Sequence, residues 1–557
     1  MSGTWQSLKN TPTFSASTAM LLTDGTVMCQ DGGGAAWWKL TPDATGDYVN
    51  GTWSPLASMH NSRLYYTSAV LRDGRVLLAG GEYSDAGSET NKVELYYPTL
   101  DLWVQIASPA GWAEVGDAPC CTLPDGRVLM GSIESNETAI FDPVSETWSA
   151  GPNKDDSSSE ETWVLLGDET VLAVECSAHP KAEKYVAAAN QWVSAGTLPV
   201  ELVQASSIEI GPGMALPDGR AFFAGATGHT ALYTPPPIAN QPGSWAAGPD
   251  FPVGPGVDLL EAKDAPGCLM PNGKVLLVAS PAGEGGSYPG PTHFFEFDPE
   301  AATMTAVPDP SNNGGPCFTG RMTMLPSGQV LFTAGTKDAY VYTPSGTYES
   351  DWRPEITSCP THLRAKQTFT LQGEQLTGLS QAASYGDDAG LATSYPLVRI
   401  RNEQSGHVRY CRTFNHSTMG IATGETTQHT SFKVPAGMEH GRARLEVVVN
   451  GIPSEPVDVV VGPFLLHFNV DEAMVNTLIG SLADGPLWVL GPHGPVPVDP
   501  WGPKIGKEAA VARDEIVRGI RELQRLGKEV EKLRHGADRF DGEVEHSAGG
   551  TRLHAVR

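Results

Sequence analysis

Positive charge is scarce in this sequence of 557 residues, which has 37 Lys and Arg against 64 Asp and Glu and a formal net charge of −27. Such an acidic chain repels phosphate backbones and anionic lipid headgroups, so neither nucleic acid nor a membrane surface is an expected partner. No apolar run is long enough to span a bilayer. The segment from Met1 to Leu22 lacks the basic and apolar regions of a secretory signal. The expected compartment is therefore the cytoplasm, unless the chain is exported by another route or processed.

Cysteine is also sparse, and its spacing excludes the common metal motifs. The 8 cysteines include no Cys-x-x-Cys pair and no zinc-ligand spacing. Most of them precede or occupy predicted strands, which favours small buried side chains over disulfides. The sequence also contains no Gly-rich phosphate loop, no Gly-x-Ser-x-Gly motif and no His-Glu-x-x-His motif. The redox compartment stays open.

What the sequence does contain is a repeated turn followed by a short apolar strand. Seven copies recur about every 50 residues, a period typical of propeller blades. They are Asp24-Gly25, Asp73-Gly74, Asp125-Gly126, the degenerate Gly167-Asp168, Asp218-Gly219, Asn272-Gly273 and Ser327-Gly328. An aromatic residue, a proline and a later tryptophan close several repeats, as in Tyr97-Pro98 with Trp103. Aromatic residues of this kind pack between neighbouring blades.

The first tryptophan strand, Thr4 to Leu8, comes before any turn and is left over by this count. We expect it to complete the seventh blade beside Ala339 to Tyr342, which would close the propeller and cover its edge strands. Residues 1–354 are therefore predicted to form an all-β, seven-bladed propeller. The position eight residues before each turn residue should face the propeller axis.

Four further segments follow the propeller. Residues 355–462 contain short alternating strands and predict an immunoglobulin-like β-sandwich. Residues 463–506 are proline-rich and are expected to form a linker. Residues 507–535 have apolar residues near heptad spacing and predict one amphipathic helix, which could dock on this chain, self-associate or bind a protein partner. Residues 536–557 are expected to form a flexible tail. With the helix predicted at 507–535, the C-terminal region as a whole is predicted to be a helical tail.

The turn pattern and the sandwich segments Ser394 to Ile400, Gly406-His407-Val408 and Asn415 to Gly420 resemble the galactose oxidase and glyoxal oxidase family. They are still more similar to bacterial kelch-repeat proteins with a galactose-oxidase-like C-terminal domain. The resemblance covers about residues 1–462 and implies a kelch-type propeller. Fold alone does not imply function.

The oxidases of that family bind copper through two tyrosines and two histidines, and one tyrosine is cross-linked to a cysteine. Carried over by position, Tyr65 matches the cross-linked tyrosine and His416 matches the histidine from the sandwich. The expected Tyr-His pair falls on Phe318 and Thr319, and the cysteine falls near Ser17. Because a copper radical needs its phenol and imidazole ligands together, copper and radical oxidase activity are disfavoured.

Acidic residues occupy much of the axial position instead. The seven residues there are Ala16, Tyr65, Asp117, Glu160, Ile210, Asp264 and Thr319. Two blades share the pattern Glu114-x-x-Asp117-Ala-Pro and Glu261-x-x-Asp264-Ala-Pro. Converging carboxylates repel one another, which raises their pKa or recruits a cation. The predicted ligand-binding residues are Tyr65, Glu114, Asp117, Glu160, Glu261, Asp264 and Thr319.

A divalent metal bound by Asp117, Asp264 and His416 is the sharper hypothesis, and calcium, magnesium, manganese or iron would suit such ligands. The alternative is that the acidic residues cap loop amides or pair with Arg63, Lys263 or Arg321. His416 could equally bond to the backbone of a sandwich loop.

We therefore predict a binding or scaffolding protein whose acidic axial pocket takes a small molecule, carbohydrate or cation. The rival function is a non-radical metalloenzyme with Glu114 or Glu261 in proton transfer. A purely structural subunit is the third alternative. The oligomeric state and the ligand are left open.

Overall fold

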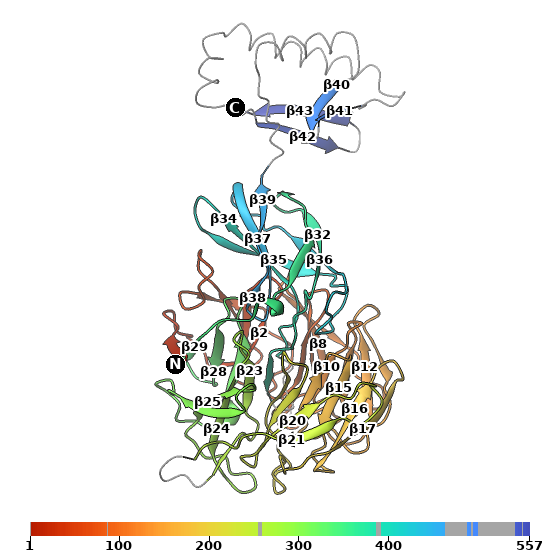
Figure 1. Cartoon of the computed structure of the whole chain (residues 1–557), viewed down its shortest axis with the longest axis vertical. Helices are drawn as coiled ribbons and strands as arrows, with labels where there is room; N and C mark the ends of the chain where they lie inside the picture. The colour runs from red at the N-terminus through yellow and green to blue at the C-terminus, as the bar shows by residue number, and fades with distance from the viewer. Residues whose placement is uncertain are drawn as a thin grey trace. The chain divides into compact units, whose positions relative to one another are not determined.

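The computed structural model describes residues 2–85, 87–253, 259–385 and 391–462, and four short strands beyond them. The chain divides into two compact units, Met1–Val460 and Val461–Arg557. The first unit holds six blade sheets of four strands, one blade sheet of six strands and a β-sheet domain of nine strands (Figure 1). Among the described residues there are two 3-10 helices, η1 (Cys317–Thr319) and η2 (Ser350–Trp352), and no α-helix.

Each blade is an antiparallel meander whose first strand is largely buried. Blades 1 to 4 contain β2 (Ala16–Leu21), β3 (Val27–Asp31), β4 (Trp37–Thr41), β5 (Thr52–Leu56), β6 (Thr67–Val70), β7 (Val76–Ala79), β8 (Val93–Tyr97), β9 (Leu102–Ile106), β10 (Cys120–Thr122), β11 (Val128–Gly131), β12 (Thr138–Asp142), β13 (Thr147–Ala150), β14 (Trp163–Leu165), β15 (Thr170–Val174), β16 (Lys181–Val186) and β17 (Gln191–Thr197).

Blades 5 to 7 repeat this plan. They contain β18 (Gly213–Ala215), β19 (Ala221–Ala224), β20 (Thr230–Thr234), β21 (Ser244–Ala247), β22 (Leu260–Glu261), β23 (Pro266–Leu269), β24 (Val275–Pro281), β25 (His293–Asp298), β26 (Thr303–Val307), β27 (Arg321–Met324), β28 (Val330–Thr333) and β29 (Ala339–Thr343). The predicted closure is confirmed, because β1 (Thr4–Ser7) pairs antiparallel with β29 as the outer strand of blade 7.

The predicted turns join the first and second strands of the blades. The backbone at Gly25, Gly74 and Gly126 has φ values of 76°, 84° and 89°, which glycine adopts without steric cost. The preceding aspartate accepts a hydrogen bond from the amide two residues on, as Asp73 Oδ1 does from Arg75 N at 3.0 Å. The Asp-Gly pattern therefore both reverses the chain and satisfies its turn amides.

The second domain is one curled sheet ordered β30-β32-β36-β35-β34-β37-β39-β31, with β38 paired to β37. Its strands are β30 (Glu355–Ser358), β31 (His362–Leu363), β32 (Thr368–Glu374), β34 (Leu397–Asn402), β35 (Val408–Phe414), β36 (Gln428–Lys433), β37 (Gly441–Val449), β38 (Ile452–Pro453) and β39 (Val457–Val461). One strand of this part of the chain, β33 (Ala383–Tyr385), pairs instead with β23, the first strand of the blade 6 meander. The domain is thus anchored inside the propeller.

The sheet domain contacts the end of the propeller that carries the Asp-Gly turns. Thr413 N donates to Thr23 O at 3.0 Å, and Met419 N donates to Pro124 O at 2.9 Å. Tyr395 OH donates to Leu21 O. These contacts cover the turn face, so the opposite face, where each first strand begins, is the one open to a ligand.

The C-terminal unit is described only as backbone. A hairpin of β40 (Leu487–Gly491) and β41 (Gly494–Val498) lies in the segment predicted as a proline-rich linker. A second hairpin of β42 (Asp541–Ser547) and β43 (Gly550–Val556) lies in the segment predicted as a flexible tail. The amphipathic helix predicted at 507–535 falls outside the described residues. No helix in the described part of the chain has the length and hydropathy needed to span a bilayer.

Candidate functional site: an acidic mouth at the propeller axis

The axial position has an unusual backbone conformation in three blades. Tyr65, Glu160 and Asp264 have φ values of 49°, 60° and 49°, in the left-handed region that residues other than glycine rarely adopt. Each lies just before the first strand of its blade. Conformations of this kind cost free energy and cluster at functional sites. We call this open end of the propeller, with the loops around it, the acidic mouth.

Three carboxylates of the mouth come from three consecutive blades. Glu160, Glu209 and Asp264 each offer an oxygen, and these oxygens lie within 4.8 Å of one another. Two backbone hydrogen bonds hold these loops: Asp264 N donates to Ile210 O of the neighbouring loop at 3.0 Å, and Gln204 N donates to Glu209 O within its own loop at 2.9 Å. We call these three residues the first carboxylate group.

Glu209 is the most buried member of the first carboxylate group, with 7 % of its surface exposed. Tyr288 OH donates to its Oε1, whereas its Oε2 has no hydrogen-bond partner among the described residues. Burying a carboxylate oxygen without a partner is costly. A cation bound between the carboxylates would remove that cost.

Asp117 supplies a second buried carboxyl with an unpartnered oxygen. It is 8 % exposed, and its Oδ1 has no hydrogen-bond partner among the residues described. Burial, together with repulsion from Glu82, Glu209 and Glu89, raises its pKa from 3.8 to about 8. The carboxyl of Asp117 thus holds a proton near neutral pH unless a positive charge replaces it.

A second carboxylate group comprises Glu89, Glu114 and Glu134, whose oxygens also lie within 4.8 Å of one another. Burial and repulsion from Glu114 and Glu82 raise the pKa of Glu89 to about 7. The members of this group are half-buried or exposed. Glu114, predicted from its spacing to join Asp117, therefore belongs to a separate set of ligand atoms.

Aromatic side chains flank the carboxylates. The rings of Tyr65 and Tyr83 lie 5.9 Å apart, and the guanidinium of Arg321 lies 5.6 Å from the Tyr65 ring centre. Elsewhere in the mouth Lys263 Nζ lies 4.3 Å from the ring centre of Tyr288. Tyr83 is 64 % exposed. The mouth therefore presents faces of rings on which positive groups already lie.

Two other predicted site residues have structural partners. Glu261 Oε1 accepts a hydrogen bond from Gly283 N at 3.0 Å and lies 4.0 Å from Lys263 Nζ. Thr319 donates its hydroxyl to the backbone O of Pro316, the residue that precedes η1. For Glu261 the structure shows what the alternative interpretation described, a buried acid that caps a loop amide.

His416 does not join the acidic residues. Its backbone N donates to Arg72 O at 3.4 Å, and its Nδ1 is 2.8 Å from Thr430 Oγ1, so it lies at the turn face, beneath the sheet domain. Burial, with the positive charge of Arg72, lowers its pKa from 6.5 to about 3. The set Asp117, Asp264 and His416 is therefore not brought together, because the inner strands separate the two faces.

Glu209, Glu82, Glu89, Tyr83 and Tyr288 were not among the predicted site residues. Glu209 directly precedes Ile210, the residue counted at the axial position in blade 5. Counting back from the turn with a tolerance of one residue would have identified Glu209. The other four lie in loops between the second and third strands of blades 2 and 6, and no repeat spacing marks them.

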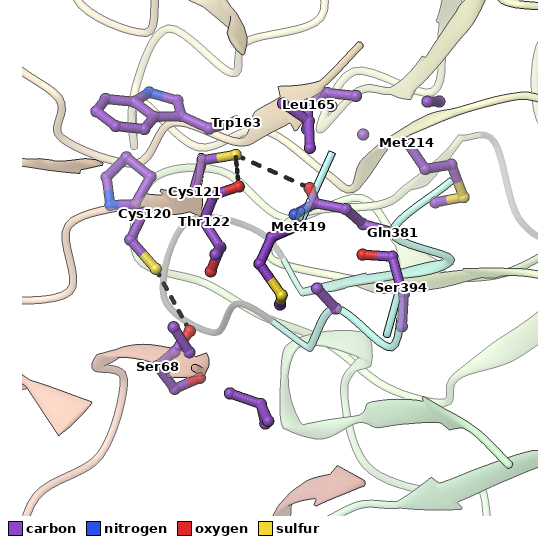
Figure 2. Close-up of a pocket in the computed structure, with 18 of the residues that line it drawn as sticks. Ser68, Cys120, Cys121, Thr122, Trp163, Leu165, Met214, Gln381, Ser394 and Met419 are labelled. Carbon is purple, nitrogen blue, oxygen red and sulfur yellow. Dashed lines mark hydrogen bonds between the residues drawn. The ribbon is translucent and has the colours of Figure 1, made fainter. Parts of the chain in front are cut away.

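A cavity lies deeper, among the first strands of blades 2 to 5 and the segment that includes Gln381 and Ser394 (Figure 2). Cys121 Sγ points to Gln381 Oε1, and Cys120 Sγ points to Ser68 O. Burial raises the pKa of the Cys120 thiol to about 12, so it stays protonated. All eight cysteines are free. None of the described residues that line this cavity carries a carboxylate, and we place the candidate site at the mouth.

The pKa of Asp117 makes a prediction for Asp117→Asn. Unfolded, this carboxyl loses its proton near pH 3.8, whereas the folded chain keeps it until about pH 8. Rising pH across that range therefore favours unfolding of the wild type, and asparagine removes the effect. We expect the Tm of the variant, relative to wild type, to rise from pH 5 to pH 8 in thermal denaturation without added cations. A difference in Tm between variant and wild type that is the same at pH 5 and at pH 8 would contradict this prediction. The exposed Asp458→Asn serves as control.

No protein-family model and no curated protein matches this sequence. Among solved structures, a fungal alcohol oxidase of the AA5 family in complex with copper has 13% sequence identity and a TM-score of 0.48, covering 83% of this chain and 99% of that chain. A catalytically inactive virginiamycin B lyase from Staphylococcus aureus with quinupristin has 12% identity and a TM-score of 0.42, covering 61% of this chain and 99% of that one. At these identities and TM-scores, neither match bears on the chemistry of this chain.

Proposed function

We propose that this chain is a binding protein whose acidic mouth holds a cationic ligand. One observation carries the proposal: Glu209 is buried within the first carboxylate group, and its Oε2 has no hydrogen-bond partner in the described part of the chain. A neutral sugar would leave the charges of the group uncompensated, whereas a cation would neutralise them. The net charge of −27 favours the same class of ligand.

Divalent metals are the simplest members of this class. Carboxylate oxygens suit calcium, magnesium, manganese and iron, and Glu160, Glu209 and Asp264 are the residues that would hold the ion. This set replaces the predicted set of Asp117, Asp264 and His416. As part of the same proposal, we assign the blades to the kelch class because of their Asp-Gly turns and closing tryptophans. We also propose that the second domain is of the immunoglobulin-like type.

A second candidate, a non-radical metalloenzyme, is favoured by Asp117. Its carboxyl interacts electrostatically with Glu209 and has a pKa of about 8, a value useful for proton transfer near neutral pH. In that case Asp117, rather than Glu114 or Glu261, would carry the proton. Detection of turnover that is lost in Asp117→Asn, with ligand binding retained, would favour the enzyme over the binding protein.

The test of the proposed function is cation binding by Glu209→Gln. The wild-type protein is titrated in a calorimeter with CaCl₂, MnCl₂, spermidine and FeSO₄, the last under anaerobic conditions. We expect at least one of these cations to bind stoichiometrically and its affinity to fall about tenfold or more in the variant, because a charged ligand oxygen is lost.

Glu300→Gln is the matched control, since Glu300 is exposed in the β25–β26 turn, at the other end of blade 6. It removes the same charge and should leave the affinity unchanged. Equal affinities of wild type and Glu209→Gln for every cation, or no binding at all, would refute the proposed function.

A further inference from the structure

The acidic mouth is wider than one metal site, because its carboxylates come from five consecutive blades. The second carboxylate group comes from blades 2 and 3, and the first from blades 4, 5 and 6. Asp117 of blade 3 belongs to neither group. The mouth is therefore an arc of negative charge with two separate places where three oxygens converge.

Backbone hydrogen bonds join the loops at the blade 2 end of this arc. Gly81 N donates to Gly116 O at 2.6 Å, and Val115 N donates to Thr90 O at 3.1 Å. These bonds hold the loop with Glu82 and Glu89 against the loop with Glu114 and Asp117. The second carboxylate group is thus built on a braced pair of loops.

Asp117 interacts electrostatically with members of both groups. Its buried, unpartnered Oδ1 belongs to a carboxyl that is repelled by Glu89 of the second group, by the neighbouring Glu82 and by Glu209 of the first group. A metal ion contacts oxygens only within about 2.6 Å. One ion in either group would therefore leave the other group uncompensated. A ligand with several positive charges along its length could compensate both.

The aromatic residues could contact the apolar segments between the positive charges of such a ligand. Tyr83 is exposed, packs on Tyr65 and interacts electrostatically with Glu82 and Asp117. A ring face binds both methylene groups and ammonium groups. The chain's own Lys263, with a methylene stem and an ammonium group, lies over Tyr288 in this way.

Building on the proposed function, we propose that the cationic ligand is a linear polyamine, which spans Asp117 and the two carboxylate groups, with its methylene segments against Tyr83. The chemistry required is two or more ammonium groups joined by short methylene chains. Each ammonium donates charge-assisted hydrogen bonds to carboxylate oxygens. Spermine and spermidine are the probes of this class.

The full chain is titrated in a calorimeter with spermine, spermidine, butylamine and CaCl₂, and the affinity and stoichiometry of each ligand are measured. We expect one spermine per chain and an affinity at least a hundredfold higher than that of butylamine, because a single ammonium group reaches only one carboxylate group. We also expect Glu209→Gln and Glu89→Gln each to weaken spermine about tenfold and together about a hundredfold. CaCl₂ binding should respond to one of the two substitutions only.

Tyr83→Ala tests the ring contact and should weaken spermine more than CaCl₂. Glu300→Gln is the control for charge, and the Tm of every variant is compared with wild type to show that it folds. Spermine that binds no better than butylamine, or that loses affinity in only one of the two glutamate variants, would overturn the polyamine inference. If CaCl₂ binding still depends on Glu209 in that case, the proposed function stands; if no cation depends on Glu209, both fail.

Discussion

Replacement of Lys154 by methionine should lower the free energy of unfolding by about 3–5 kcal/mol. Lys154 Nζ is fully buried and lies 2.7 Å from Glu161, 2.8 Å from Glu183 and 3.2 Å from Asp156. Burial lowers the pKa of the lysine, but these three carboxylates raise it above its ordinary value, so the ammonium stays charged. Methionine fills a similar volume and leaves three buried or half-buried acids without their cation.

The measurement is urea denaturation, with Lys181→Met as control. Lys181 pairs with Asp155 at 3.5 Å, and both side chains are more than half exposed. Such a surface pair contributes about 0–1 kcal/mol. The loss in Lys154→Met should shrink at acidic pH, where the orphaned carboxylates take up protons. Equal, small losses in the two variants would show that the buried cluster does not stabilise blade 4.

Truncation of Trp5 to alanine should cost about 2–3 kcal/mol, below the usual range for a fully buried tryptophan because Trp5 is half-buried. The ring centre of Trp5 lies 4.8 Å from that of Tyr342 in blade 7 and 4.9 Å from that of Phe294 in blade 6. Its Nε1 donates to Pro308 O at 2.8 Å. These contacts hold β1 in the blade where the two ends of the propeller meet.

Trp148→Ala is the matched control. Trp148 has the equivalent position in the outer strand of blade 3, where its Nε1 donates to Ala107 O at 2.9 Å. We expect a similar loss of unfolding free energy from both variants. Only Trp5→Ala should speed limited proteolysis near residue 10. The other outer strands directly follow the third strand of their own blade in the sequence, whereas β1 is joined to its blade 7 only by pairing with β29. Unchanged proteolysis and stability in Trp5→Ala would refute its role in closure.

The spacing of turns was enough to predict part of the site as well as the blades. Counting back from each turn reached Tyr65, Glu160 and Asp264, which share a left-handed backbone at the mouth. This works because a strand has a nearly fixed rise per residue, so the eight residues before each turn span a similar distance in every blade. It fails for Tyr83 and Tyr288, since loops between the second and third strands vary in length and leave no period.

The all-β class, the seven blades and the closing strand could be predicted from the sequence, because they depend on local turn chemistry and on a repeat that must close on itself. Which acids are neighbours became clear only from the folded chain. Glu209 joins Glu160 and Asp264, Glu114 joins Glu89 and Glu134, Glu261 caps a loop amide, and His416 lies at the opposite face. Such neighbours come from different blades, and their contacts depend on loop paths and burial, which no pattern along one strand encodes.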